Sequence, residues 1–164
     1  MILVADAAPL IFLAKINQLS LLTKLFKAEI LVPSAVNQEI LGPEVPPDEE
    51  RVLTTFISGC KIADLRKPIK FAQALSFADN CILTVATRQG AAMVLSDDRL
   101  LRKTAVIEGF GVIGTIGVLL RANKNSLLNA EETKRLIRQL VEDHNFRIST
   151  TVYDGAVRAL SEFD

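Results

Sequence analysis

The sequence has no tryptophan, one tyrosine, one histidine and two cysteines among its 164 residues. With so few rings on which bases could stack, we do not expect a module that binds single strands by stacking alone. A nucleophilic mechanism that needs histidine would rest entirely on His144, for which a surface position is the simpler interpretation. Cys60 and Cys81 lack the C-x-x-C spacing of zinc and redox sites, so we interpret them as inert thiols.

Net charge is also absent, because 19 basic residues balance 19 acidic ones. Proteins that wrap nucleic acid are usually strongly basic, so contact with nucleic acid would need a local basic patch or a metal bridge. No apolar run approaches the roughly 18 residues that span a bilayer. The chain enters Ile2-Leu3-Val4 without the basic region of a signal peptide. We therefore expect a cytoplasmic protein without membrane contact.

A chain that is 49% hydrophobic and 23% charged has the composition of a globular domain. Short apolar runs predict strands at residues 1–5, 29–32, 91–95 and 112–113. Helical periodicity and end signals predict helices at residues 7–16, 19–27, 33–40, 49–58, 76–88, 100–108, 116–123, 130–143 and 151–163. Residues 61–70 (KIADLRKPIK) are expected to form a basic connector.

This alternation of strands and helices is typical of an α/β domain whose parallel sheet carries helices on both faces. We divide the chain into a domain over residues 1–125 and a C-terminal helical extension over residues 126–164. The extension has apolar residues at helical spacing. It is expected to pack on the same domain or on the partner in a homodimer.

Acidic side chains follow two of the predicted strands. Asp6 ends the first strand, and the Asp97-Asp98 pair ends the strand at residues 91–95. Because parallel α/β sheets bind ligands outside the carboxyl ends of their strands, these acids are candidates for a metal site. Glu39 and Asp79, each on a predicted helix, extend the set, and carboxylates are the ligands that Mg²⁺ prefers. Taken singly, each acid also fits a helix cap or a solvated helix position.

Five segments resemble PIN domains in the order in which those domains carry them. Residues 4–11 (VADAAPLI) and 32–39 (VPSAVNQE) are similar to the opening of such a domain. Residues 75–79 (LSFAD), 94–99 (VLSDDR) and 111–115 (GVIGT) extend the match. The resemblance covers about residues 1–125 and is closest to the prokaryotic VapC-like branch.

The resemblance implies a three-layer α/β/α sandwich with a short central parallel sheet, followed here by C-terminal helices. It also implies cleavage of RNA that depends on Mg²⁺ or Mn²⁺, in the toxin component of a toxin–antitoxin pair. The expected partners are therefore an RNA substrate, a small antitoxin and a second copy of the chain. The implied metal ligands are Asp6, Glu39, Asp79 and one of Asp97 and Asp98.

Asp98 is preferred to Asp97 as the fourth catalytic acid, because it lies two residues past Ser96. Ser96 matches the small hydroxyl residue that the family places beside the site. Arg99 and Arg102 are expected to steady substrate phosphate, although a solvated helix face explains them equally well. Many active PIN domains carry a further acid after the last strand's aspartate, whereas Arg99-Leu100-Leu101 follow here. The alternative is therefore a catalytically weak or inactive module that binds nucleic acid or a regulatory partner.

Overall fold

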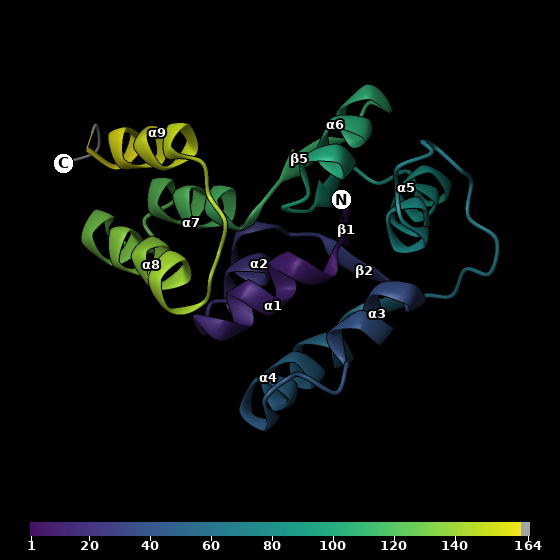
Figure 1. The fold of residues 1–164 in the computed structure, drawn as a ribbon, viewed down its shortest axis with the longest axis horizontal. Helices are drawn as coiled ribbons and strands as arrows, with labels where there is room; N and C mark the ends of the chain where they lie inside the picture. The colour runs from purple at the N-terminus through teal and green to yellow at the C-terminus, as the bar shows by residue number, and fades with distance from the viewer. Residues whose placement is uncertain (162–164) are drawn as a thin grey trace.

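Five short parallel strands form the centre of the fold, in the spatial order β3-β2-β1-β4-β5 (Figure 1). The computed structural model describes residues 1–161, and the predicted end of the last helix at residue 163 lies outside that range. The strands are β1 (Ile2–Ala5), β2 (Glu29–Pro33), β3 (Lys61–Ala63), β4 (Met93–Leu95) and β5 (Gly111–Ile113). Helices lie on both sides of this sheet, as the sequence predicts.

The helices follow the strands in alternation and fill the outer layers. In chain order they are α1 (Ala7–Lys15), α2 (Ser20–Leu25), α3 (Ser34–Ile40), α4 (Pro47–Ser58), α5 (Phe77–Gln89), α6 (Arg99–Ile107), α7 (Thr115–Lys124), α8 (Ala130–Asp143) and α9 (Thr150–Ser161). Helix α5 packs against β1, β2 and β4, while α1 contacts α3, α4 and α7. No helix within residues 1–161 has both the length and the hydrophobicity that a membrane span requires.

The two central strands are apolar throughout, because both faces of a covered parallel sheet are buried. Leu3, Val4 and Ala5 of β1 are fully buried, and they pair in register with Met93, Val94 and Leu95 of β4. This register brings the carboxyl ends of β1 and β4 to the same height. From β1 the chain runs outward to β2 and β3 and then returns to place β4 on the opposite side. The reversal creates the crevice in which such sheets bind ligands.

Residues 61–63 correct the prediction of a connector over residues 61–70. They form edge strand β3, whose Ile62 pairs with Val32 of β2. Lys61 and Ile62 are both exposed, so the segment shows neither an apolar run nor a clean alternation. Its pairing with β2 makes it a strand.

A strap, defined here as residues 64–76, crosses α5 without forming a helix or a strand. Side chains of α5 satisfy its backbone: the Phe71 amide donates to Asn80 Oδ1 at 2.9 Å, and the Ile69 amide donates to Thr84 Oγ1 at 2.8 Å. Asn80 Nδ2 donates in turn to the Ser76 carbonyl at 2.9 Å. Two polar side chains in the buried face of α5 therefore hold the strap and the start of that helix.

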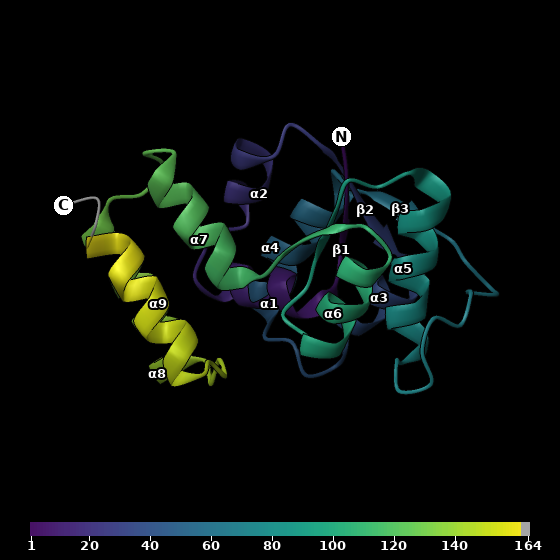
Figure 2. The same cartoon turned by 90° about the horizontal axis from the view of Figure 1, so that it is seen from above.

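The C-terminal helices gather at one end of the molecule, away from α3 and α5 (Figures 1 and 2). Helices α8 and α9 pack on α7 and on each other. Leu136, Leu140 and Leu160 are buried and belong to the same continuous core as the sheet. The connection between α8 and α9 returns to α1, where the rings of Phe146 and Phe12 meet edge to face at 4.8 Å.

Replacing Asn80 with alanine is expected to lower the free energy of unfolding by about 2 kcal/mol, because the partly buried Phe71 amide loses its acceptor. Urea denaturation measures the loss, and amide exchange at Phe71 should accelerate. Gln73→Ala, an exposed change in the same strap, is the control and should shift stability by less than about 0.5 kcal/mol. Equal stability of the two variants would contradict the role given to Asn80.

Candidate functional site

Asp6 lies at the point where β1 ends and α1 begins. Its side chain is 9% exposed and caps α1 by accepting a hydrogen bond from the Ala7 amide at 2.7 Å. The Asp6 amide donates to the Leu95 carbonyl of β4 at 2.9 Å, which continues the strand pairing by one residue. The carboxylate is therefore fixed between the carboxyl ends of β1 and β4.

Ser96 fixes the second oxygen of the same carboxylate. Its hydroxyl donates to Asp6 Oδ2 at 2.8 Å and accepts from the Asp98 amide at 3.0 Å. Ser96 is fully buried, and its hydroxyl contacts the Asp6 carboxylate and the Asp98 backbone. Its hydroxyl holds the Asp6 carboxylate in place and so links the end of β1 to the end of β4.

The pKa of Asp6 is raised from 3.8 to about 6. Burial is the largest cause, because it penalises the charged carboxylate. The hydrogen bonds from Ser96 and Ala7 lower the pKa, while the negative charges of Asp79 and Glu39 raise it. These contributions show that Asp6, Glu39 and Asp79 interact electrostatically even though they come from three separate elements.

Glu39 and Asp79 reach this edge of the sheet from helices. Asp79 sits in the first turn of α5 and completes a capping box with Ser76, accepting from the Ser76 amide at 2.9 Å and donating its own amide to Ser76 Oγ at 3.1 Å. Glu39 is exposed near the end of α3. Partial burial and the negative charge of Asp79 raise the pKa of Glu39, because both disfavour its charged form.

Asp97 and Asp98 take different structural roles. Asp97 accepts two hydrogen bonds from Thr115, one from the amide at 2.7 Å and one from the hydroxyl at 2.6 Å. Burial raises the pKa of Asp97, against the effect of those bonds and of the Arg102 charge. Asp98 is exposed and caps α6 by accepting from the Leu101 amide at 2.7 Å. Neither charge contributes to the pKa shift of Asp6.

The absence of a side chain at Gly114 permits the contact between β4 and α7. A Cβ atom there would lie 2.5 Å from Arg102 Nη1 and 2.6 Å from Asp97 Oδ1. The peptide before Thr115 can therefore approach Asp97 closely enough for both hydrogen bonds. Thr115 was not singled out as a site residue from the sequence, although it ends the segment GVIGT.

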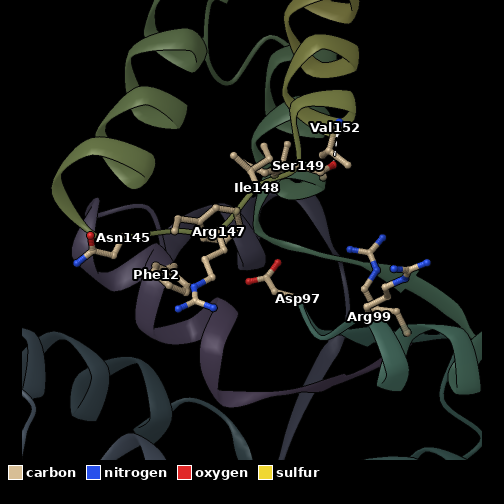
Figure 3. Close-up of a pocket in the computed structure, with 12 residues that line it drawn as sticks. Phe12, Asp97, Arg99, Asn145, Arg147, Ile148, Ser149 and Val152 are labelled. Atoms are coloured by element: carbon tan, nitrogen blue, oxygen red, sulfur yellow. Dashed lines mark hydrogen bonds between the residues drawn. The ribbon is translucent and has the colours of Figure 1, made fainter.

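A pocket of about 710 Å³ opens beside Asp97 (Figure 3). Arg99 and Arg102 of α6 line it together with Arg147, which comes from the connection between α8 and α9. In Figure 3, Asp97 lies between Arg147 on one side and Arg99 on the other. Arg147 has no signal in the sequence, because it is a lone cation between two helices.

A family model described as a PIN domain matches residues 2–162. The chain belongs to the PIN-domain family. PIN domains are generally a metal-dependent nuclease fold, and most are hydrolases. The match also includes the residues after 125, which the resemblance described in the sequence analysis does not cover.

Comparisons with solved structures and with curated proteins give no further information on function. The chain is similar to a solved structure described as a domain of a functionally unknown protein from Methanocaldococcus jannaschii DSM 2661, at 22% identity and a TM-score of 0.48, covering 69% of this chain and 89% of that one. No curated protein matches the chain.

In this PIN domain the acids expected to hold metal are only partly brought together. Asp6, Glu39 and Asp79 share one electrostatic environment. Asp97 and Asp98 are engaged by Thr115 and by the start of α6. Within residues 1–161, no group of three or more Asp, Glu, His or Cys side chains is close enough to hold an ion by itself.

The raised pKa of Asp6 predicts how the stability of the PIN domain varies with pH. Because the folded value of about 6 exceeds the ordinary value of 3.8, the folded state binds the proton more tightly, and stability falls as pH rises through this window. Asp6→Asn removes this titration. Between about pH 4 and pH 7, the wild type should lose roughly 2 to 3 kcal/mol relative to this variant.

Chemical denaturation across that pH range measures the difference in metal-free buffer. Asp154→Asn, an exposed change on α9, is the control and should follow the wild type at every pH. Parallel stability curves for the wild type and Asp6→Asn would contradict the shifted pKa.

Proposed function

We propose that this PIN domain is a ribonuclease that hydrolyses RNA phosphodiesters with the help of Mg²⁺ or Mn²⁺. The observation that carries the proposal is the fixed, buried carboxylate of Asp6 at the crevice between β1 and β4, whose pKa the charges of Asp79 and Glu39 raise further. Membership of a generally nucleolytic family supports the same reaction class.

The three acids fit a divalent cation in donor type and in charge. Mg²⁺ takes oxygen ligands, keeps several waters and commonly uses only one or two protein carboxylates. A site of this kind does not require three acids in mutual contact, and no such group is present within residues 1–161. In this proposal Asp6 would bind the cation directly, and Glu39 and Asp79 would contact it through water. A bound cation would also relieve the repulsion that raises the pKa values of Asp6 and Glu39.

The residues of the chain have distinct roles in this proposal. When bound, the cation supplies a water of lowered pKa and stabilises charge on the phosphate. Asp6 presents its carboxylate in one orientation, because Ser96 and the Ala7 amide each hold one of its oxygens. Glu39, at the exposed end of the set, would contribute its carboxylate to the cation's surroundings. Asp79 adds negative charge from a position that its capping box makes rigid.

Purified protein is expected to cleave a labelled single-stranded RNA with Mn²⁺ and to stop when EDTA is added. Asp6→Asn should lower the rate by at least about a hundredfold, because the fixed ligand loses its charge. Gel electrophoresis of the products measures the rate. Asp154→Asn is the matched control and should retain full activity. Equal cleavage by both variants would point to a contaminating nuclease.

We further propose that the protein is the toxin of a toxin–antitoxin pair, acting as a homodimer in the cytoplasm. The similarity of the segment VLSDDR to the VapC-like branch supports this assignment. Induced expression in a bacterial host should arrest growth, whereas Asp6→Asn should not. Co-expression of the small protein encoded next to this gene should restore growth. Normal growth of cells that hold soluble, folded wild-type protein would reject the toxin assignment.

The second candidate is a catalytically inactive module that binds RNA or a protein partner. The observation that favours it is the engagement of Asp97 and Asp98 by Thr115 and by α6, which leaves the set of free acids small. Absence of cleavage by the folded wild type with either Mg²⁺ or Mn²⁺ would favour this candidate over the nuclease.

A further inference from the structure

The pocket beside Asp97 combines parts of the chain that are far apart in sequence. Arg99 and Arg102 come from α6, Ile116 and Gly117 from α7, and Phe12 from α1, while residues 145–149 and Val152 close the opposite wall. The edge-to-face contact of Phe146 with Phe12 fixes this wall, and so does the hydrogen bond from the Phe146 amide to the Leu140 carbonyl at 2.9 Å. Arg147 therefore follows directly after a residue that two contacts hold in place.

The charge of the pocket is unbalanced. Three arginines and a single carboxylate, that of Asp97, line it, and Thr115 already donates to both oxygens of that carboxylate. Among residues 1–161, neither Arg99 nor Arg147 forms an ion pair with another side chain, and both are exposed. In a chain of zero net charge, this concentration of unpaired cations forms a local site for an anion.

The remaining walls of the pocket are largely apolar. Phe12, Ile148 and Val152 contribute carbon surface, and Val152 is 52% exposed. Asn145 and Ser149 add hydrogen-bonding groups. A volume of about 710 Å³ lies within the range of pockets that hold small organic molecules. Cations beside an apolar wall match a ligand that has a phosphate and a flat, weakly polar ring.

We propose that this pocket binds one nucleotide of single-stranded RNA, next to the acids at the end of β1. Arg147 holds its phosphate, because a guanidinium group bonds a phosphate with two parallel hydrogen bonds. Arg99, on the other side of Asp97, contacts the next phosphate of the strand. The apolar wall at Phe12 and Ile148 receives the base. Only an unpaired strand can place a base there, since bases in a duplex remain stacked. The proposal rests on the proposed function only in taking RNA as the ligand.

The location of the pocket gives it a role in positioning RNA. Asp97 borders the pocket, and the preceding Ser96 holds the carboxylate of Asp6. A nucleotide in the pocket would therefore place the neighbouring phosphodiester over the crevice between β1 and β4. The C-terminal segment would thus select single strands and align them for the acids, without taking part in the chemistry.

The test is binding of a short, fluorescently labelled single-stranded RNA of about ten nucleotides to the full chain in EDTA, followed by anisotropy at several salt concentrations. Arg147→Gln should weaken binding about tenfold, because one charged phosphate contact is lost. The slope of log affinity against log salt should fall by about 0.7. Arg147→Lys should retain the wild-type slope.

Arg88→Gln is the matched control, an exposed arginine in the last turn of α5, and should bind as the wild type does. Arg99→Gln repeats the test from the opposite wall and should also weaken binding. Thermal unfolding verifies that each variant is folded. RNA binding by Arg147→Gln that equals binding by Arg88→Gln would overturn the proposal, as would failure of the wild type to bind RNA. Tighter, Arg147-dependent binding of a poly-glutamate peptide would replace RNA with an acidic partner.

The two proposals can fail separately. Binding is measured without metal, so RNA binding that depends on Arg147 but is not followed by cleavage in Mn²⁺ would reject the nuclease and keep the pocket. Cleavage in Mn²⁺ by a wild type whose binding does not depend on Arg147 would reject the pocket and keep the nuclease.

Discussion

The hydrogen bond from the Ser96 hydroxyl to Asp6 Oδ2 is the interaction on which the organisation of the site depends. It joins the ends of the two central strands and holds a carboxylate where burial disfavours its charge. One hydroxyl and one backbone amide orient both oxygens of that carboxylate. The same hydroxyl accepts from the Asp98 amide, so the start of α6 is positioned together with Asp6.

The acids around this bond differ in how firmly their helices and strands hold them. Asp6 ends a strand and is rigid, Asp79 is held by its capping box, and Glu39 lies on an exposed helix surface. Asp97 has a structural role, because its bonds to Thr115 tie the end of β4 to the start of α7. The acidic edge therefore contains one group that faces a crevice and another that joins two elements.

The sequence predicts the centre of this arrangement better than its periphery. The strands that contain Leu3 and Val94 are continuous apolar runs, and the parallel pairing of their ends follows from the alternation with helices. β3 was missed because a three-residue edge strand with exposed Lys61 and Ile62 has no periodic signal. The electrostatic effect of Glu39 and Asp79 on Asp6 depends on how α3 and α5 pack, which sequence periodicity does not specify. Arg147 lies in its pocket because Phe12 and Phe146 contact each other. These two residues are distant in sequence, and no local sequence pattern predicts their contact.

The edge-to-face contact of Phe12 with Phe146 also affects how the protein is made. A ribosome synthesises every acid of this edge, the last of which is Asp98, before it reaches Arg147. A nascent chain can thus fold its sheet and its carboxylates before it has the surface proposed to hold RNA. On that proposal, the carboxylates are in place before the chain acquires the residues that hold RNA, and a product terminated before Arg147 would lack those residues.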